Sequence, residues 1–168
     1  MALLLSLAAC SETGLFRQYE YDEDVYLSLD GSAVVYVNGS LSALDALHGA
    51  TFETGPAARI DRETIRKYYA GSNVHVARVS FSRRSNRRFV HVRLDVDDVR
   101  RLSETVPFAW STYHFSRDGN QFAYQQLVGP SSHNDLPGAG WTGQEIVAFR
   151  LHLPSKVSGT NSPRGVGR

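Results

Sequence analysis

The alternation of residue types between Phe89 and Val96 constrains the fold of this chain more than any other feature. Every second residue is apolar, and the residues between them, His91, Arg93 and Asp95, are polar or charged. Neighbouring side chains of a strand point to opposite faces of a sheet. The pattern therefore predicts a strand with one buried face and one face in water, which is typical of an antiparallel sheet.

Three turn sequences predict that the chain folds back on itself in hairpins. Asp-Gly is one of the strongest short signals for a tight turn, and it occurs at Asp30-Gly31 and at Asp118-Gly119. A third turn is expected around Ser85-Asn86. The strands joined by these turns are expected at 19–29 with 33–37, 74–81 with 89–96, and 110–115 with 121–128.

Short helices are expected between the hairpins, because apolar residues there recur at helical spacing. They are expected at 41–47, 61–71 and 97–107, and a last strand at 146–153 follows a loop at 129–143. Helices inserted singly between antiparallel strands are typical of an α+β domain. We expect a mostly antiparallel sheet built of hairpins, with two or three short helices packed on one face.

The start of the chain resembles a bacterial lipoprotein signal. The apolar run Met1–Ser6 leads into Leu7-Ala8-Ala9-Cys10, which is similar to a lipobox. Small residues before the cut fit the signal peptidase, and the thiol of Cys10 can carry a thioether-linked diacylglycerol. The alternative is a buried N-terminal segment with a chance cysteine. Lipidation would anchor the protein on the extracytoplasmic side of a bacterial membrane, in the cell envelope.

The expected organisation follows from this signal. Residues 1–10 are the signal peptide, 11–18 a tether, 19–154 a single domain and 155–168 a polar tail. A signal peptide normally opens with basic residues, yet no Lys or Arg precedes Arg17. We therefore expect that a basic start is missing before Met1, and that a final strand or anchor helix is absent after the tail.

Four arginines surround Ser85-Asn86 and form the densest charge in the chain: Arg83, Arg84, Arg87 and Arg88. Guanidinium groups match phosphate oxygens, so this turn is a candidate contact for anionic head groups. The alternative is a solvated hairpin tip, where charge discourages strand pairing between molecules. With a net charge of +1, the whole chain has no general attraction for nucleic acid.

Aromatic residues gather in the C-terminal third of the chain. They suggest an apolar groove that takes a lipid chain or a peptide. The alternative is that half of them belong to the core. The candidate ligand-binding residues are Trp110, Tyr113, Phe115, Phe122, Tyr124 and Trp141.

No motif for catalysis or metal binding is recognisable. The six histidines show no metal-ligand spacing, and the acidic run 20–24, expected as a solvated strand face, lacks the pattern of a calcium loop. Ser131–Asp135 contains a hydroxyl, an imidazole and a carboxylate, but adjacency along the chain does not build a triad. With Cys10 lipidated, no thiol remains for a disulfide. We expect no enzyme activity, no cofactor and no metal.

The lipobox Leu7–Cys10, the hairpin with Asp30-Gly31 and the segment 74–102 together resemble the LppM-like lipoproteins. This resemblance implies a surface-exposed domain that binds lipid or glycolipid, without catalytic residues. We therefore expect a membrane-anchored lipoprotein that binds a lipid, a glycolipid or an envelope protein. Two alternatives remain open: an assembly component whose sheet edges pair with another chain, and a hydrolase that uses His133 or another histidine.

Overall fold

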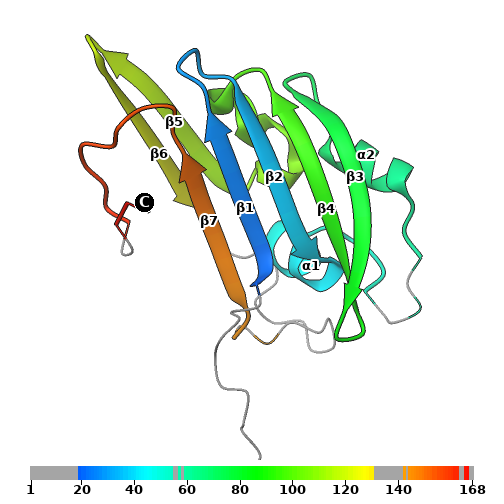
Figure 1. Ribbon diagram of the computed structural model, residues 1–168. Coiled ribbons are helices and arrows are strands. Elements are labelled where there is room, and N and C mark those ends of the chain that lie inside the picture. Colours follow the sequence, from blue (N-terminus) through cyan, green and yellow to red (C-terminus); the bar gives the residue numbers. More distant parts are fainter. Residues whose placement is uncertain are drawn as a thin grey trace, which may run out of the picture.

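The computed structural model describes residues 19–54, 57, 59–130, 142, 144–162 and 165–166. It confirms the α+β class and the mostly antiparallel sheet with short helices. The main sheet has five strands in the order β3-β4-β2-β1-β7 (Figure 1). Their bounds are β1 Tyr19–Leu27, β2 Ala33–Ser40, β3 Val74–Arg84, β4 Arg87–Val96 and β7 Ile146–His152.

The last strand differs in direction from the rest of the sheet. β1, β2, β4 and β3 pair antiparallel in turn, whereas β7 runs parallel to β1 at the edge of the sheet. The third predicted hairpin forms a sheet of its own, made of β5 (Ser111–Asp118) and β6 (Gln121–Val128). In the described part of the structure this hairpin does not pair with a strand of the main sheet, and its strand β5 packs against η1.

One face of the main sheet is the core face. Val35, Val37 and Leu94 are buried there, together with apolar residues of every helix. The helices are α1 (Leu41–His48), α2 (Arg62–Tyr69), and the 3₁₀ helices η1 (Val99–Glu104) and η2 (Val106–Phe108). The other face, the outer face, presents the polar residues of the predicted alternation. No helix within the described residues is long and apolar enough to cross a bilayer.

Local sequence signals explain where the helices begin and end. Ser40 accepts a hydrogen bond from the backbone N–H of Ala43 at the start of α1, and Gly49 ends that helix in the left-handed conformation. Asp61 caps α2 in the same way through Thr64. The helix expected from residue 97 begins at Val99, and Asp98 caps it by accepting from the backbone N–H of Arg100.

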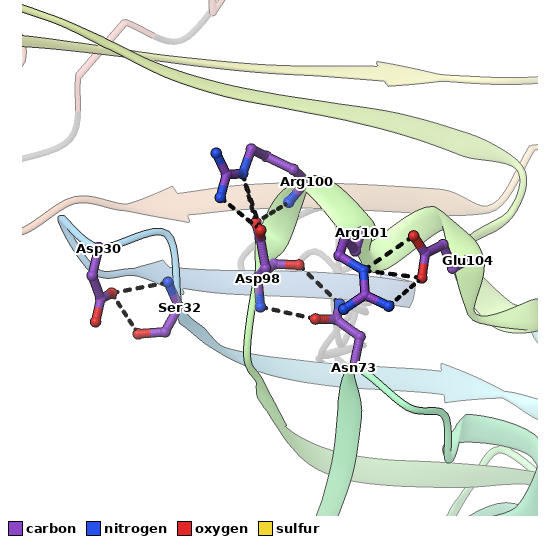
Figure 2. Close-up of polar contacts among 7 residues, drawn as sticks. All are labelled: Asp30, Ser32, Asn73, Asp98, Arg100, Arg101 and Glu104. Atoms are coloured by element: carbon purple, nitrogen blue, oxygen red, sulfur yellow. Dashed lines mark hydrogen bonds and ion pairs between the residues drawn. The ribbon is translucent and has the colours of Figure 1, made fainter.

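Asn73 ties the start of β3 to the start of η1, as Figure 2 shows. Its side-chain amide donates to the carbonyl of Asp98 over 2.8 Å and its side-chain oxygen accepts from the Asp98 N–H over 2.9 Å. Asn73 is 1% exposed. The buried side chain of Asn73 thus satisfies the N–H and the carbonyl of Asp98, as a neighbouring strand would do in a sheet.

Candidate functional site

The outer face of the main sheet carries an open recess of about 560 Å³. It lies over β2, β4 and β3, on the face opposite to the helices. Its side chains provide hydroxyl, amide, imidazole and guanidinium groups around a small apolar floor. The lining residues are Tyr36, Asn38, Ala77, Arg78, Ser80, His91, Val92 and Arg93.

A chain of hydrogen bonds crosses four strands at one end of this recess. His91 lies between Ser82 on β3 and Asn38 on β2, with contacts of 2.7 Å and 2.8 Å, and Asn38 donates to Asp22 on β1 over 2.8 Å. Because the Asn38 amide nitrogen faces Asp22, its oxygen accepts from His91 Nδ1–H. In neutral His91, Nε2 is then the acceptor for the hydroxyl of Ser82. The arrangement has the order hydroxyl, imidazole, amide, carboxylate.

Partial burial lowers the pKa of His91 below its ordinary value of 6.5. The carboxylate of Asp22 raises this pKa and the charge of Arg84 lowers it, but burial is the largest influence. His91 is therefore mostly neutral at pH 7. The alternation predicted that His91 and Arg93 lie on the face in water, and their exposure confirms this placement.

Arg78 and Arg93 lie directly opposite each other on β3 and β4, and both line the recess. Arg93 also contacts the carboxylate of Asp95 on its own strand, over 3.3 Å. Among the described residues Arg78 has no ion pair. The β3 side of the recess is thus cationic.

The β1 side of the outer face is acidic, but its charges are compensated. Arg150 lies 3.0 Å from Asp24 and 3.6 Å from Asp22, and His152 lies 3.0 Å from Asp24. The ring of His152 stacks on Tyr26 with 4.0 Å between ring centroids. The prediction that the acidic run 20–24 is a solvated strand face is wrong. The side chains of Asp22 and Asp24 are only 18% exposed beneath these partners, Glu20 is 16% exposed beside Arg84 and Arg87, and Glu23 is buried.

The predicted arginine cluster is divided by the hairpin that carries it. Arg83 pairs with Arg88 and Arg84 with Arg87 across the turn, so adjacent arginines point to opposite faces of the hairpin. Arg87 lies 3.1 Å from Glu20 and Arg84 lies 3.9 Å from it, and Arg84 also covers the ring of Phe89. The four residues therefore do not form one cationic surface.

Most of the candidate aromatic residues that the structure describes pack in or against the core. Tyr113 is 3% exposed, and Trp110, Phe115 and Tyr124 pack against the core. Phe122 stacks on Phe115 with 5.8 Å between ring centroids. This placement supports the interpretation as core residues. Cys10, His133 and Trp141 lie outside the described residues.

Sequence reasoning missed a buried carboxylate between the sheet and the β5–β6 hairpin. Glu23 is 0% exposed and accepts hydrogen bonds of 3.0 Å from Tyr21 and from Gln126 on β6. Burial raises its pKa to about 7, against the smaller lowering effect of the two donors. The sequence did hold a signal for this burial. Glu23 lies between Tyr21 and Val25 on the same face of the strand, whereas Asp22 and Asp24 lie on the other face.

A buried histidine lies against the ring of Tyr21. His48 is 8% exposed, its ring lies 5.0 Å from that of Tyr21, and burial lowers its pKa to about 3. Neither ring nitrogen has a hydrogen-bond partner among the described residues. No group of three or more His, Cys, Asp or Glu side chains able to hold a metal ion occurs in the described part of the chain.

No protein-family model matches this sequence, and no curated protein matches it either.

Proposed function

We propose that this protein is a lipid-anchored, non-catalytic binding protein of the bacterial cell envelope. The location rests on the sequence Leu7-Ala8-Ala9-Cys10, and the resemblance to the LppM-like lipoproteins points the same way. The observation that carries the binding role is the recess on the outer face, a polar concave surface on the side of the sheet away from the core. Its ligand is the head group of a lipid or glycolipid.

The chemistry of the recess fits a polar head group better than an acyl chain. Asn38, Ser80 and His91 supply hydrogen-bonding groups, and the ring of Tyr36 supplies an apolar surface with a polar tip. A few directed polar groups around an apolar floor are the usual composition of a small-ligand site. Four of the aromatic residues proposed for acyl-chain binding instead lie in the core or pack against it: Trp110, Tyr113, Phe115 and Tyr124.

Lipidation is tested in bacteria that express the chain. Inhibition of the lipoprotein signal peptidase with globomycin should accumulate a larger, uncleaved precursor, and labelled palmitate should be incorporated. A Cys10→Ser variant should show neither effect. An unchanged protein size on globomycin treatment would refute the anchoring.

The binding role is tested by mass spectrometry of lipids that copurify with the full chain. We expect a lipid or glycolipid that is lost in an Asn38→Ala, Tyr36→Ala double variant. Recovery of one stoichiometric protein without lipid would instead favour the assembly component. The matched control is Gln125→Ala, an exposed polar residue on β6 far from the recess.

A second candidate function, a hydrolase, is favoured by the contacts of His91. The order Ser82, His91, Asn38 is that of a nucleophile, a base and the group that orients the base. In this function Ser82 Oγ would attack an ester carbonyl while its proton passes to His91 Nε2, which then protonates the leaving alcohol. Water would release the acyl group from Ser82 by the reverse proton transfers.

Labelling with a fluorophosphonate separates the two functions. A hydrolase would be labelled at Ser82, and the label would disappear in His91→Gln. The binding protein that we propose first should stay unlabelled, with Ser82→Ala retaining its bound lipid.

A further inference from the structure

Strand β3 contains an irregularity that changes which of its side chains face the recess. The register with β4 shifts between Val76 and Arg78, so that Ala77 is an extra residue. Val76 pairs with buried Leu94 on the core face, whereas Arg78 pairs with exposed Arg93 on the outer face. If Ala77 were paired in the regular register with Arg93, alternation would turn position 78 toward the core. Bulges commonly serve to redirect a side chain in this way.

The result is a pair of like charges side by side. Positive side chains directly opposite each other on neighbouring strands destabilise a sheet. Asp95 contacts Arg93, but both side chains are about half exposed, at 45% and 50%. An exposed pair of this kind compensates little of the charge. Arg78 contacts no carboxylate in the described part of the protein, which leaves the pair with a net positive charge.

We propose that Arg78 and Arg93 bind the phosphate group of a lipid head group in the outer-face recess. The inference rests on the proposed function and names the chemical class of its ligand. A phosphate placed between the two guanidinium groups removes their repulsion and accepts several charge-assisted hydrogen bonds. Ser80, which lines the same recess, adds a hydroxyl donor, and the remaining volume accommodates the rest of a head group.

Charge complementarity selects this part of the outer face over the rest. On the β1 side the arginine and histidine charges are taken by Asp22 and Asp24. At the hairpin tip Arg84 and Arg87 lie near Glu20. Arg78, in contrast, lines the recess, and no carboxylate of the described residues lies beside it.

The experiment uses the full chain with Cys10→Ser, so that a lipid anchor cannot itself insert into vesicles. Sedimentation is measured with vesicles of phosphatidylcholine and with vesicles that also contain phosphatidic acid, whose head group is a phosphate monoester. We expect binding to the second kind only. Arg78→Gln and Arg93→Gln should each weaken it at least about tenfold, as expected for loss of a charge-assisted contact.

Arg88→Gln is the matched control, because it removes the same charge from the same hairpin but outside the recess. It should bind as the parent does. A second readout is thermal unfolding without ligand: Arg78→Gln should raise the melting temperature, since it removes repulsion. A variant that lost binding because it unfolded would melt at a lower temperature, and this result would count against the inference.

Three further outcomes would overturn the inference. Equal binding to both kinds of vesicle would contradict an anionic ligand while leaving the proposed function intact. Loss of binding in Arg88→Gln alone would place the contact at the hairpin tip. Binding of inorganic phosphate that phosphatidic acid vesicles do not compete would show a free anion as the ligand. Failure of lipidation at Cys10, in contrast, would refute the proposed anchoring and leave these measurements unaffected.

Discussion

Glu23 on β1 and Gln126 on β6 are joined by a hydrogen bond of 3.0 Å between side chains that are 103 positions apart. It is a polar contact between the main sheet and the β5–β6 hairpin. Tyr21 donates to the other carboxylate oxygen over the same distance. Within the described part of the chain this carboxylate has two hydrogen-bond donors and no ion pair, and burial raises its pKa to about 7.

Glu23→Gln should make the protein more stable at pH 8 and leave it nearly unchanged at pH 4. Glu23 has a raised pKa, so its contribution to stability is complete below 4.5 and is lost as the pH rises through about 7. The full difference corresponds to the order of 3 kcal/mol. Urea unfolding at both pH values measures it. A variant no more stable than the parent at pH 8 would contradict the assignment.

His48→Phe should remove the contribution of His48 to the pH dependence of stability, which is opposite in sign to that of Glu23. Its lowered pKa means that its contribution is complete above 6.5 and is lost as the pH falls toward about 3. Between pH 4.5 and 6.5 the slopes from Glu23 and His48 therefore oppose each other in the parent. The phenylalanine variant should lose stability steadily from pH 4.5 to 7, while Glu23→Gln should gain it from 4.5 to 6.5. Parallel pH profiles of the two variants would refute this balance.

Asn73→Ala should destabilise the fold by about 2 kcal/mol, because it removes two hydrogen bonds to Asp98 and leaves partly buried backbone groups without partners. Chemical unfolding gives the value. Glu104→Gln is the control from the same region (Figure 2). It breaks an exposed pair with Arg101 and should cost less than about 0.5 kcal/mol. Equal losses would show that burial of Asn73 is not decisive.

Gly129→Ala should destabilise the protein by about 3 kcal/mol, since a methyl group there would lie 2.2 Å from the carbonyl oxygen of Trp110. The same glycine donates its N–H to that oxygen over 2.7 Å, so the two backbones cannot separate without losing a bond. Gly159→Ala, where nothing lies within 4 Å, is the control and should be neutral. Thermal unfolding measures the loss of stability in each variant, and equal melting temperatures would contradict the predicted clash at Gly129.

The predicted elements were those with local signals. The Asp-Gly turns and the alternation after Phe89 act over a few residues, and the structure confirms both. The parallel pairing of β7 with β1 has no such signal. It depends on which edge of the sheet remains open after the other strands have paired, and that is a property of the whole fold.

The site was less predictable for a related reason. The densest arginine run suggested an anion site, but strand alternation divides that run and Glu20 compensates part of it. Sequence reasoning did not single out Arg78, although the predicted hairpin of 74–81 with 89–96 places it opposite Arg93. A signal does exist: apolar residues fall on even positions up to Val76 and on odd positions from Val79, which marks the bulge between them.

The pairing of β1 with β7 has a consequence for the order of events during synthesis. Asp24 and Arg150 are 126 positions apart, so one edge of β1 stays without its strand partner until β7 has been made. Throughout that interval the acidic side chains of β1 have not yet met Arg150. Like charges on an exposed strand discourage pairing between neighbouring molecules. Until β7 pairs there, the carboxylates of β1 thus give the open edge a negative charge that disfavours pairing with a second molecule.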